Sequence, residues 1–161
     1  MTARQLLEEM ADLESRIAVI YERFAAQFRA AADVSDLWAS MSREELHHAD
    51  LLSRAAGHAG PDPVDLALVD AIGKLQAVVL RHEDEQARIV ELQAALQVTA
   101  DLEEAEDEHL HAHLSQLGTA ASALAENPAM QHRLRGVLEY AIKVFGTPAL
   151  QQRVARRRFR H

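Results

Sequence analysis

Two Glu-x-x-His pairs are the residues of this sequence best suited to chemistry. His48 follows Glu45 by three positions, and His109 follows Glu106 in the same way. In an α-helix this spacing places both side chains of a pair on one face of adjoining turns, so each pair can hold one cation. A carboxylate and a neutral imidazole are ligands that iron and manganese accept. The two pairs therefore predict a site for two metal ions.

Glutamates also interrupt the apolar faces of the predicted helices. At about 100° per residue, Glu14, Glu45 and Glu83 lie within the apolar arcs of the first, second and third helices. In the fourth helix Glu106 lies at the edge of the apolar stripe and Glu108 nearly opposite to it, so Glu106 is the predicted inward acid. Burying several ionised carboxylates in one core is prohibitive without counter-charge. We therefore expect cations among them. Tyr21, two turns beyond Glu14, could hydrogen-bond a ligand or donate an electron.

The elements that position these side chains are helices. The sequence has only 6 Gly and 4 Pro, and its long stretches of Ala, Leu, Glu, Gln and Arg favour helix. Breakers and apolar spacing predict helices over residues 2–31, 36–56, 64–98, 99–125 and 130–145. The start of the third is open between Pro63 and Lys74. The predicted fold is all-α, with a four-helix bundle over residues 1–126 and a C-terminal helix and basic tail over residues 127–161.

An internal match links the first and third predicted helices. Glu14–Ala26 and Glu83–Ala95 agree in the positions of their glutamates and alanines. The chain is therefore expected to form two related helical hairpins, with the first and third helices as counterparts.

The composition excludes several kinds of site and partner. The absence of cysteine rules out disulfides, thiolate zinc sites and rubredoxin-type iron centres. A net charge of −8 argues against nucleic acid as a partner. No segment approaches the ~20 apolar residues of a membrane span, and Met1–Met10 lacks the pattern of a signal peptide, so we expect a soluble cytoplasmic protein without membrane contact. Residues 149–161 hold five arginines and no acid, and this tail is either a solvated end or a contact for an anionic partner.

These motifs resemble those of a known family. Residues 14–25, followed by residues 45–50, resemble the first two helices of rubrerythrins and bacterioferritins, which are ferritin-like di-iron carboxylate proteins. Glu83 and then residues 106–110 resemble their third and fourth helices, so the similarity covers roughly residues 5–120. The resemblance implies a ferritin-like four-helix bundle with a long crossover between the second and third helices. The fifth C-terminal helix lies outside it.

The resemblance also implies a ligand set. The matched positions are metal ligands in that family, with Glu45 and Glu106 bridging, and with Glu14 and His48, and Glu83 and His109, as terminal pairs. The interval from Glu83 to Glu106 is shorter than is usual there, so Glu108 with His111 stays open as an alternative in the fourth helix. Leu46 stands where bacterioferritins carry a haem-ligating methionine, so no haem is expected.

The implied function is that of a di-iron oxidoreductase that oxidises Fe(II) with peroxide or oxygen, as a ferroxidase or a rubrerythrin-like peroxidase. Its cofactors would be two iron ions, with manganese or a mixed iron and manganese pair as alternatives. The resemblance further implies an external electron donor and a homo-oligomer, a dimer or larger. Two other functions stay open: a ferritin-like oxygenase acting on a small organic substrate, and a non-enzymatic iron-binding or adaptor bundle.

Overall fold

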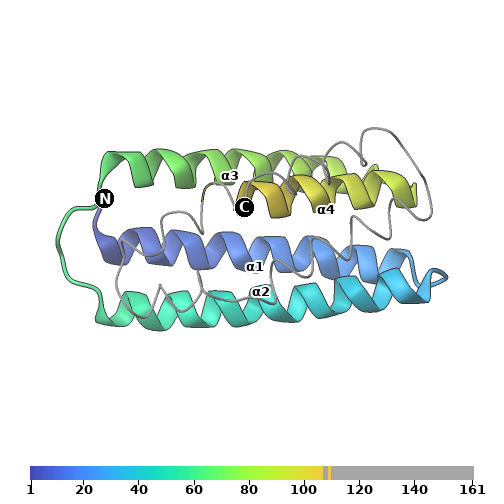
Figure 1. Ribbon diagram of the computed structural model, residues 1–161, viewed down its shortest axis with the longest axis horizontal. Helices are drawn as coiled ribbons and strands as arrows, with labels where there is room; N and C mark the ends of the chain where they lie inside the picture. The colour runs from blue at the N-terminus through green and yellow to red at the C-terminus, as the bar shows by residue number, and fades with distance from the viewer. Residues whose placement is uncertain (107–108, 110–161) are drawn as a thin grey trace, which may run out of the picture.

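The computed structural model describes residues 1–106 and 109, and this part of the chain is helical. Its helices are α1 (Ala3–Gln27), α2 (Ala32–His58), α3 (Leu66–Gln86) and α4 (Leu92–Glu106). They lie along one long axis, and consecutive helices run in opposite directions (Figure 1). No strand occurs among the described residues, which confirms the all-α prediction for them. The predicted helix over residues 130–145 and the tail over residues 149–161 lie outside them.

The turn between α1 and α2 is as short as predicted but lies four residues earlier in the chain. Helix α1 ends at Gln27, and α2 already begins at Ala32 instead of Asp36. The hydroxyl of Ser35, in the first turns of α2, donates a 2.9 Å hydrogen bond to the carbonyl of Ala25. A carbonyl near the end of α1 is thus satisfied by the next helix, which fixes where the chain reverses.

The connection between α2 and α3 is short. It comprises residues 59–65, so the prediction of a long crossover between the second and third helices is wrong. Backbone hydrogen bonds hold this loop against the chain start: Ala3 N–H donates to the Asp62 carbonyl, and Val64 N–H donates to the Met1 carbonyl, both at 3.2 Å. Helix α3 therefore starts beside the start of α1 and runs parallel to it (Figure 1).

Helix α3 ends earlier than the sequence suggests. The prediction of one helix over residues 64–98 is wrong, because α3 ends at Gln86 and α4 begins at Leu92. The intervening residues contain neither glycine nor proline, so no local breaker marks the turn. The side chain of Gln27, at the end of α1, donates a 2.5 Å hydrogen bond to the carbonyl of Ile89. The end of α1 thus contacts the α3–α4 turn, a tertiary contact that a helical pattern cannot reveal.

The early end of α3 also overturns the predicted internal symmetry. Residues 14–26 lie wholly within α1, whereas residues 83–95 span the end of α3, a turn and the start of α4. The two segments are therefore not equivalent helices, and their matching glutamates do not occupy equivalent places.

Thr99 joins α4 to α2 in the core. The prediction that Thr99 lies at a helix start is wrong, because Thr99 lies inside α4. Its hydroxyl accepts a 2.9 Å hydrogen bond from Trp38 Nε1 and donates a 3.0 Å hydrogen bond to the carbonyl of Ala95. Trp38 packs against Phe24 and Phe28, with ring centroids 5.2 and 5.5 Å away. This buried hydrogen bond fixes the indole ring.

Replacing Thr99 with valine should destabilise the protein by about 1–3 kcal/mol, because the shape is kept but the buried indole N–H loses its acceptor. Urea unfolding of the purified variant measures this loss. Thr99→Ser keeps the hydroxyl and serves as the control. A valine variant as stable as the unmodified protein would contradict the role given to this hydrogen bond.

The buried faces of α1 and α2 each contain a glutamate. On α1 the buried residues recur at three- and four-residue intervals and include Leu7, Met10, Glu14, Ile17, Ala18 and Tyr21. On α2 they include Trp38, Met41, Glu45, His48, Ala49 and Leu52. The prediction that Glu14 and Glu45 point into the core is confirmed.

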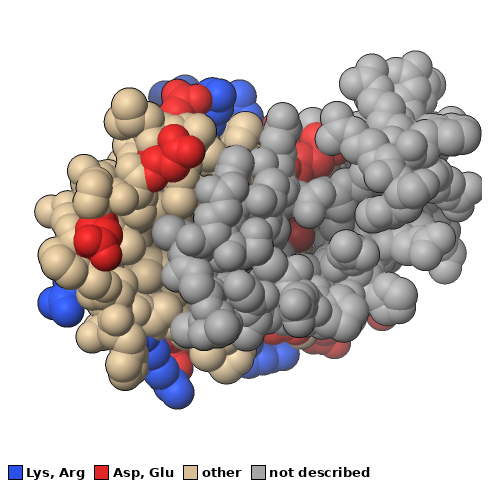
Figure 2. Space-filling model, turned by 60° about the vertical axis from the view of Figure 1, so that its left-hand side comes forward, with Lys and Arg blue, Asp and Glu red and all other residues tan. Residues whose placement is uncertain are grey.

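The surface of the described part carries charges of both signs. On the part of the face in Figure 2 that the described residues form, both acidic and basic side chains are visible. No helix within the described residues combines the length and the apolar character that spanning a membrane requires. Charges that are exposed to solvent need no special explanation, whereas buried charges do.

Candidate metal centre

A cluster of buried acids and one histidine lies between α1, α2 and α4. Each member exposes 6% of its surface or less: Glu14, Glu45, His48, Glu103 and Glu106. Carboxylates are almost never this buried unless they are paired or coordinate a metal. Three helices thus bring ionisable side chains to one place in the core.

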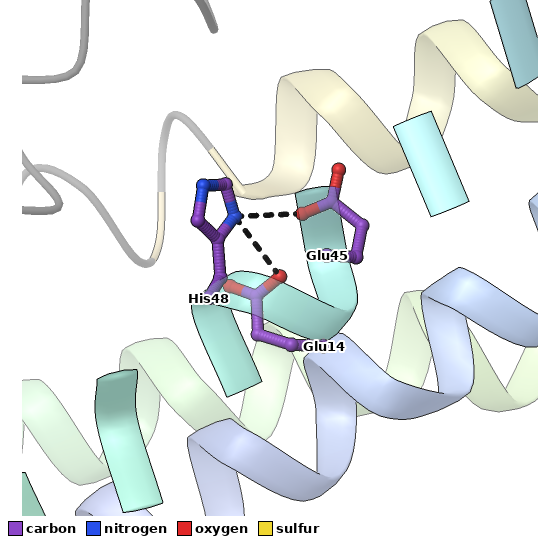
Figure 3. A group of neighbouring side chains, drawn as sticks. All are labelled: Glu14, Glu45 and His48. Atoms are coloured by element: carbon purple, nitrogen blue, oxygen red, sulfur yellow. Dashed lines mark hydrogen bonds and ion pairs between the residues drawn. The ribbon is translucent and has the colours of Figure 1, made fainter. Parts of the chain in front are cut away.

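The first half of the cluster joins α1 to α2 (Figure 3). His48 Nδ1 lies 2.8 Å from Glu45 Oε2 and 3.8 Å from Glu14 Oε2. One ligand atom from each of these residues lies within 4.8 Å of the other two. Glu14 Oε2 is buried and accepts no hydrogen bond from the described residues. Two carboxylate oxygens and an imidazole nitrogen therefore face a common point.

The second half of the cluster joins α2 to α4. Glu45, Glu103 and Glu106 each offer a carboxylate oxygen within 4.8 Å of the other two. Glu103 and Glu106 lie three residues apart on α4, so both reach the same side of that helix. Glu45 belongs to both halves of the cluster. Two cations placed in the two halves would therefore have Glu45 as a shared ligand.

The electrostatics of the cluster disfavour its charged form without a cation. Burial raises the pKa of Glu14 from 4.5 to about 7, and the charge of Glu103 acts in the same direction, although a hydrogen bond with Glu45 opposes the rise. Burial also raises the pKa of Glu45 well above its usual value, despite the hydrogen bond from His48. A bound cation favours the ionised carboxylates and reverses this cost. The donor set and its burial therefore fit a metal ion.

Tyr21 adds a hydrogen-bond donor beside the cluster. Its hydroxyl donates a 2.9 Å hydrogen bond to Glu103 Oε1, and its side chain is fully buried. Burial and the neighbouring charges of Glu103, Glu106 and Glu45 raise the pKa of this hydroxyl well above 10, so Tyr21 holds its proton at neutral pH. The sequence placed Tyr21 near a ligand, and the structure shows the carboxylate that it contacts.

Glu83 lies apart from the cluster. The buried face of α3 is formed by Leu68, Ala71, Ile72, Leu75, Val79, His82 and Gln86. Glu83 falls beside this face and pairs with Arg16 of α1, whose Nε and Nη2 lie 2.8 and 2.5 Å from its two carboxylate oxygens. This guanidinium lowers the pKa of Glu83. The prediction that Glu83 points into the core with the other acids is wrong. The predicted apolar face of this helix included residues 87–94, but α3 ends at Gln86, and the face that it buries does not contain Glu83.

Replacing Glu83 with glutamine should leave metal stoichiometry and affinity unchanged, because this carboxylate lies outside both halves of the cluster. Stability should fall by at most about 1 kcal/mol, since the pair with Arg16 is about one quarter exposed. Metal titration and urea unfolding of the variant measure the two effects. Loss of one bound metal ion would show that Glu83 is a ligand after all.

Glu103 is the functional candidate that the sequence analysis missed. It enters the cluster from α4, the helix that also provides Glu106. The predicted partner His109 is half-buried and is in neither group of converging ligand atoms. The alternative pair, Glu108 with His111, lies outside the described residues, so the choice between the two pairs stays open.

The described chain is thus an all-α protein with a buried carboxylate and histidine cluster that fits metal ions. Comparison with protein-family models, curated proteins and solved structures gives no significant match to this chain. The resemblance to ferritin-like proteins therefore rests on the sequence motifs and on the convergence of Glu14, Glu45, His48 and Glu106, whereas Glu83 lies outside the cluster.

Proposed function

We propose that the chain is a di-metal carboxylate protein whose ligands resemble those of ferritin-like proteins, without their long crossover, and that it acts as a di-iron oxidoreductase. The observation that carries this proposal is that Glu45 belongs to both converging groups, one with Glu14 and His48 and one with Glu103 and Glu106. Facing helices that each contribute inward carboxylates are the usual way in which a helical bundle holds two metal ions. Rubrerythrins and bacterioferritins, which the motifs resemble, are a chemical precedent for such a site.

The residues of the chain have separate tasks in this proposal. Glu14 and His48 would hold one ion, Glu103 and Glu106 the other, and Glu45 would contact both. Two bound ferrous ions would supply one electron each, which matches the two electrons and two protons that reduce one hydrogen peroxide to two waters. The buried apolar side chains around the cluster exclude bulk water and so strengthen its electrostatic interactions.

The proposed reaction is oxidation of Fe(II) by peroxide or oxygen. If the protein turns over as a peroxidase, reduction of the oxidised site requires an external electron donor, because the chain has no cysteine with which to build a rubredoxin-type centre. The proposal also includes assembly into a homo-oligomer, which only the resemblance implies. It includes contact between the arginine-rich end and an anionic partner, which rests on the charge of residues 149–161.

Stopped-flow absorbance on the metal-free protein, loaded anaerobically with Fe(II) and mixed with peroxide or oxygen, tests the proposed function. We expect two iron ions per chain by elemental analysis and a fast change at near-ultraviolet wavelengths with at least one oxidant. Fast oxidation with peroxide and no mineral favours the peroxidase, and progressive mineral growth favours a ferroxidase. Iron binding without any oxidation would leave a non-enzymatic bundle, and the absence of binding would refute the metal centre.

Replacing Tyr21 with phenylalanine should weaken metal binding at the Glu103 position by roughly 10- to 100-fold, the range found when a residue that orients a ligand is removed. The phenol donates to Glu103 and thereby fixes that carboxylate, whereas phenylalanine keeps the ring but not the donor. Calorimetric titration with Mn(II) measures the change. Unchanged affinity would show that Glu103 needs no orientation by Tyr21.

A further inference from the structure

An open cavity lies at the end of the bundle where α1 ends and the chain turns from α3 into α4 (Figure 1). Its volume is about 530 Å³, within the range of roughly 300–1,000 Å³ that is usual for small-molecule sites. Phe24, which lines it, lies about three turns beyond Glu14 on α1, or roughly 15 Å along the helix. The cavity is therefore separate from the candidate metal centre.

The walls of the cavity are mostly apolar. Two apolar residues of α1 and three of the α3–α4 turn line it: Phe24, Ala26, Ala87, Ile89 and Val90. Val90 exposes 78% of its surface, which leaves apolar area free for contact. Gln27 also lines the cavity, and its hydrogen bond to the carbonyl of Ile89 ties the two walls together. The cavity can thus hold the apolar body of a small molecule.

Gln86, the last residue of α3, brings a buried amide to this cavity. Only 9% of its surface is exposed, and its buried Oε1 accepts no hydrogen bond from the described residues. A buried polar group without a partner costs stability. The terminal amide of glutamine rotates readily, so either its oxygen or its amino group can face a ligand. A hydroxyl group, which both donates and accepts, fits this amide in either orientation.

Arg23 adds a positive charge to the same cavity. Its side chain is exposed and takes part in no hydrogen bond or ion pair with the part of the chain that the structure describes. The charge of Arg23 lowers the pKa of Glu83, but both oxygens of that carboxylate already accept hydrogen bonds from Arg16. A guanidinium binds a carboxylate through two parallel hydrogen bonds. Arg23 is therefore placed to bind the carboxylate of a ligand.

We infer that this cavity binds a small organic carboxylate that has an apolar body and a hydroxyl group. The carboxylate contacts Arg23, the hydroxyl contacts the amide of Gln86, and the apolar body packs against the α3–α4 turn. An inorganic anion meets only the first of these contacts, and a hydrocarbon only the last. The site goes beyond the proposed metal function and does not depend on it.

Calorimetric titration of the metal-free, full-length protein with para-hydroxybenzoate tests the inference. We expect saturable binding of one molecule per chain with a Kd at or below about 1 mM. Benzoate lacks the hydroxyl and should bind roughly 3- to 10-fold more weakly. Acetate lacks the apolar body and should show no saturable binding in the same range.

Two variants of the cavity assign the contacts. Arg23→Gln should weaken the binding of both aromatic acids by at least roughly tenfold, because a charge-assisted pair is lost. Gln86→Leu should reduce the affinity for para-hydroxybenzoate to that for benzoate and leave benzoate binding unchanged. Arg4→Gln makes the same change of charge at an exposed residue near the other end of α1, and this control should bind as the unmodified protein does. Urea unfolding confirms that the variants are folded.

The results have separate meanings for this site and for the metal centre. Binding of para-hydroxybenzoate that both cavity variants weaken as stated supports the inference. Equal affinity for para-hydroxybenzoate and benzoate, acetate binding as tight as benzoate binding, or an unchanged affinity in folded Arg23→Gln would overturn it. The absence of saturable binding in the millimolar range would overturn it as well. Each of these failures leaves the proposed function intact, because metal binding is measured in a different titration.

Discussion

Replacing Glu45 with glutamine is expected to weaken metal binding at both positions by at least about 100-fold, more than the usual effect of losing a residue that only orients a ligand. Glu45 is the residue common to the two groups of converging ligand atoms, so its charge serves both cations. The amide keeps the size of the side chain and can still pair with His48, but it is a poor ligand and carries no charge. Titration with Fe(II) under anaerobic conditions, followed by stopped-flow oxidation, measures the loss of both binding and activity.

Variants that change one half of the cluster are the controls for this result. Glu106→Gln should weaken the second position and spare the first, which Glu14, Glu45 and His48 still form. If Glu45→Gln instead loses a single ion and keeps the other at its original affinity, Glu45 does not serve both positions. The proposed di-metal arrangement would then be wrong even though the protein binds a metal.

The half of the site on α1 and α2 could be predicted from the sequence because it depends on helical periodicity alone. Glu14 and Glu45 lie within long uninterrupted helices, so their angular position relative to the apolar residues follows from their spacing. His48 is fixed relative to Glu45 in the same way. Tertiary packing then places these two faces against each other, as expected for two amphipathic helices joined by a short turn.

In the other half, Glu106 is buried in the cluster as predicted, but Glu103 was missed and Glu83 was wrongly assigned to the core, because the predicted third helix ran past the observed end of α3. A helix continued through residues 87–91 assigns Glu83 to the core, whereas the observed turn leaves Glu83 with Arg16. That turn contains no glycine or proline and is held partly by Gln27 from α1. A long-range contact helps to hold this turn, and single-sequence patterns do not contain such contacts.

A signal for Glu103 nevertheless exists in the sequence. Leu96, Thr99 or Ala100, Glu103 and Glu106 follow one another at three- and four-residue intervals, the spacing of one helix face. Because a helix start was predicted near Thr99, Leu96 was assigned to another helix and the series was not recognised. The buried residues of α4 include the whole series, so a helix begun at Leu92 would have identified Glu103 as an inward acid.

Replacing Glu14 with glutamine should stabilise the metal-free protein at and above neutral pH by about 3 kcal/mol, and leave it little changed near pH 4. The pKa of Glu14 is raised from 4.5 to about 7 in the folded state, mainly by burial. Below pH 4.5 the carboxyl is protonated in both states and contributes nothing to the difference. Between pH 4.5 and about 7 the unfolded chain releases the proton and the folded chain keeps it, so the free energy of unfolding falls as pH rises. Above about pH 7 the loss is complete, and glutamine, which does not titrate, avoids it.

Urea unfolding from pH 4 to pH 8 in the presence of a chelator measures this difference, and adding metal should reverse its sign. A bound cation stabilises the unmodified folded protein by mass action and favours the ionised form of Glu14, whereas the glutamine variant gains less from the same metal. Glu83→Gln is the control. The pKa of Glu83 is lowered and not raised, so this variant should show no stabilisation at high pH. A stability difference between Glu14→Gln and the unmodified protein that does not change from pH 4 to pH 8 would show that Glu14 titrates normally. The buried acid would then carry no cost for a metal ion to relieve.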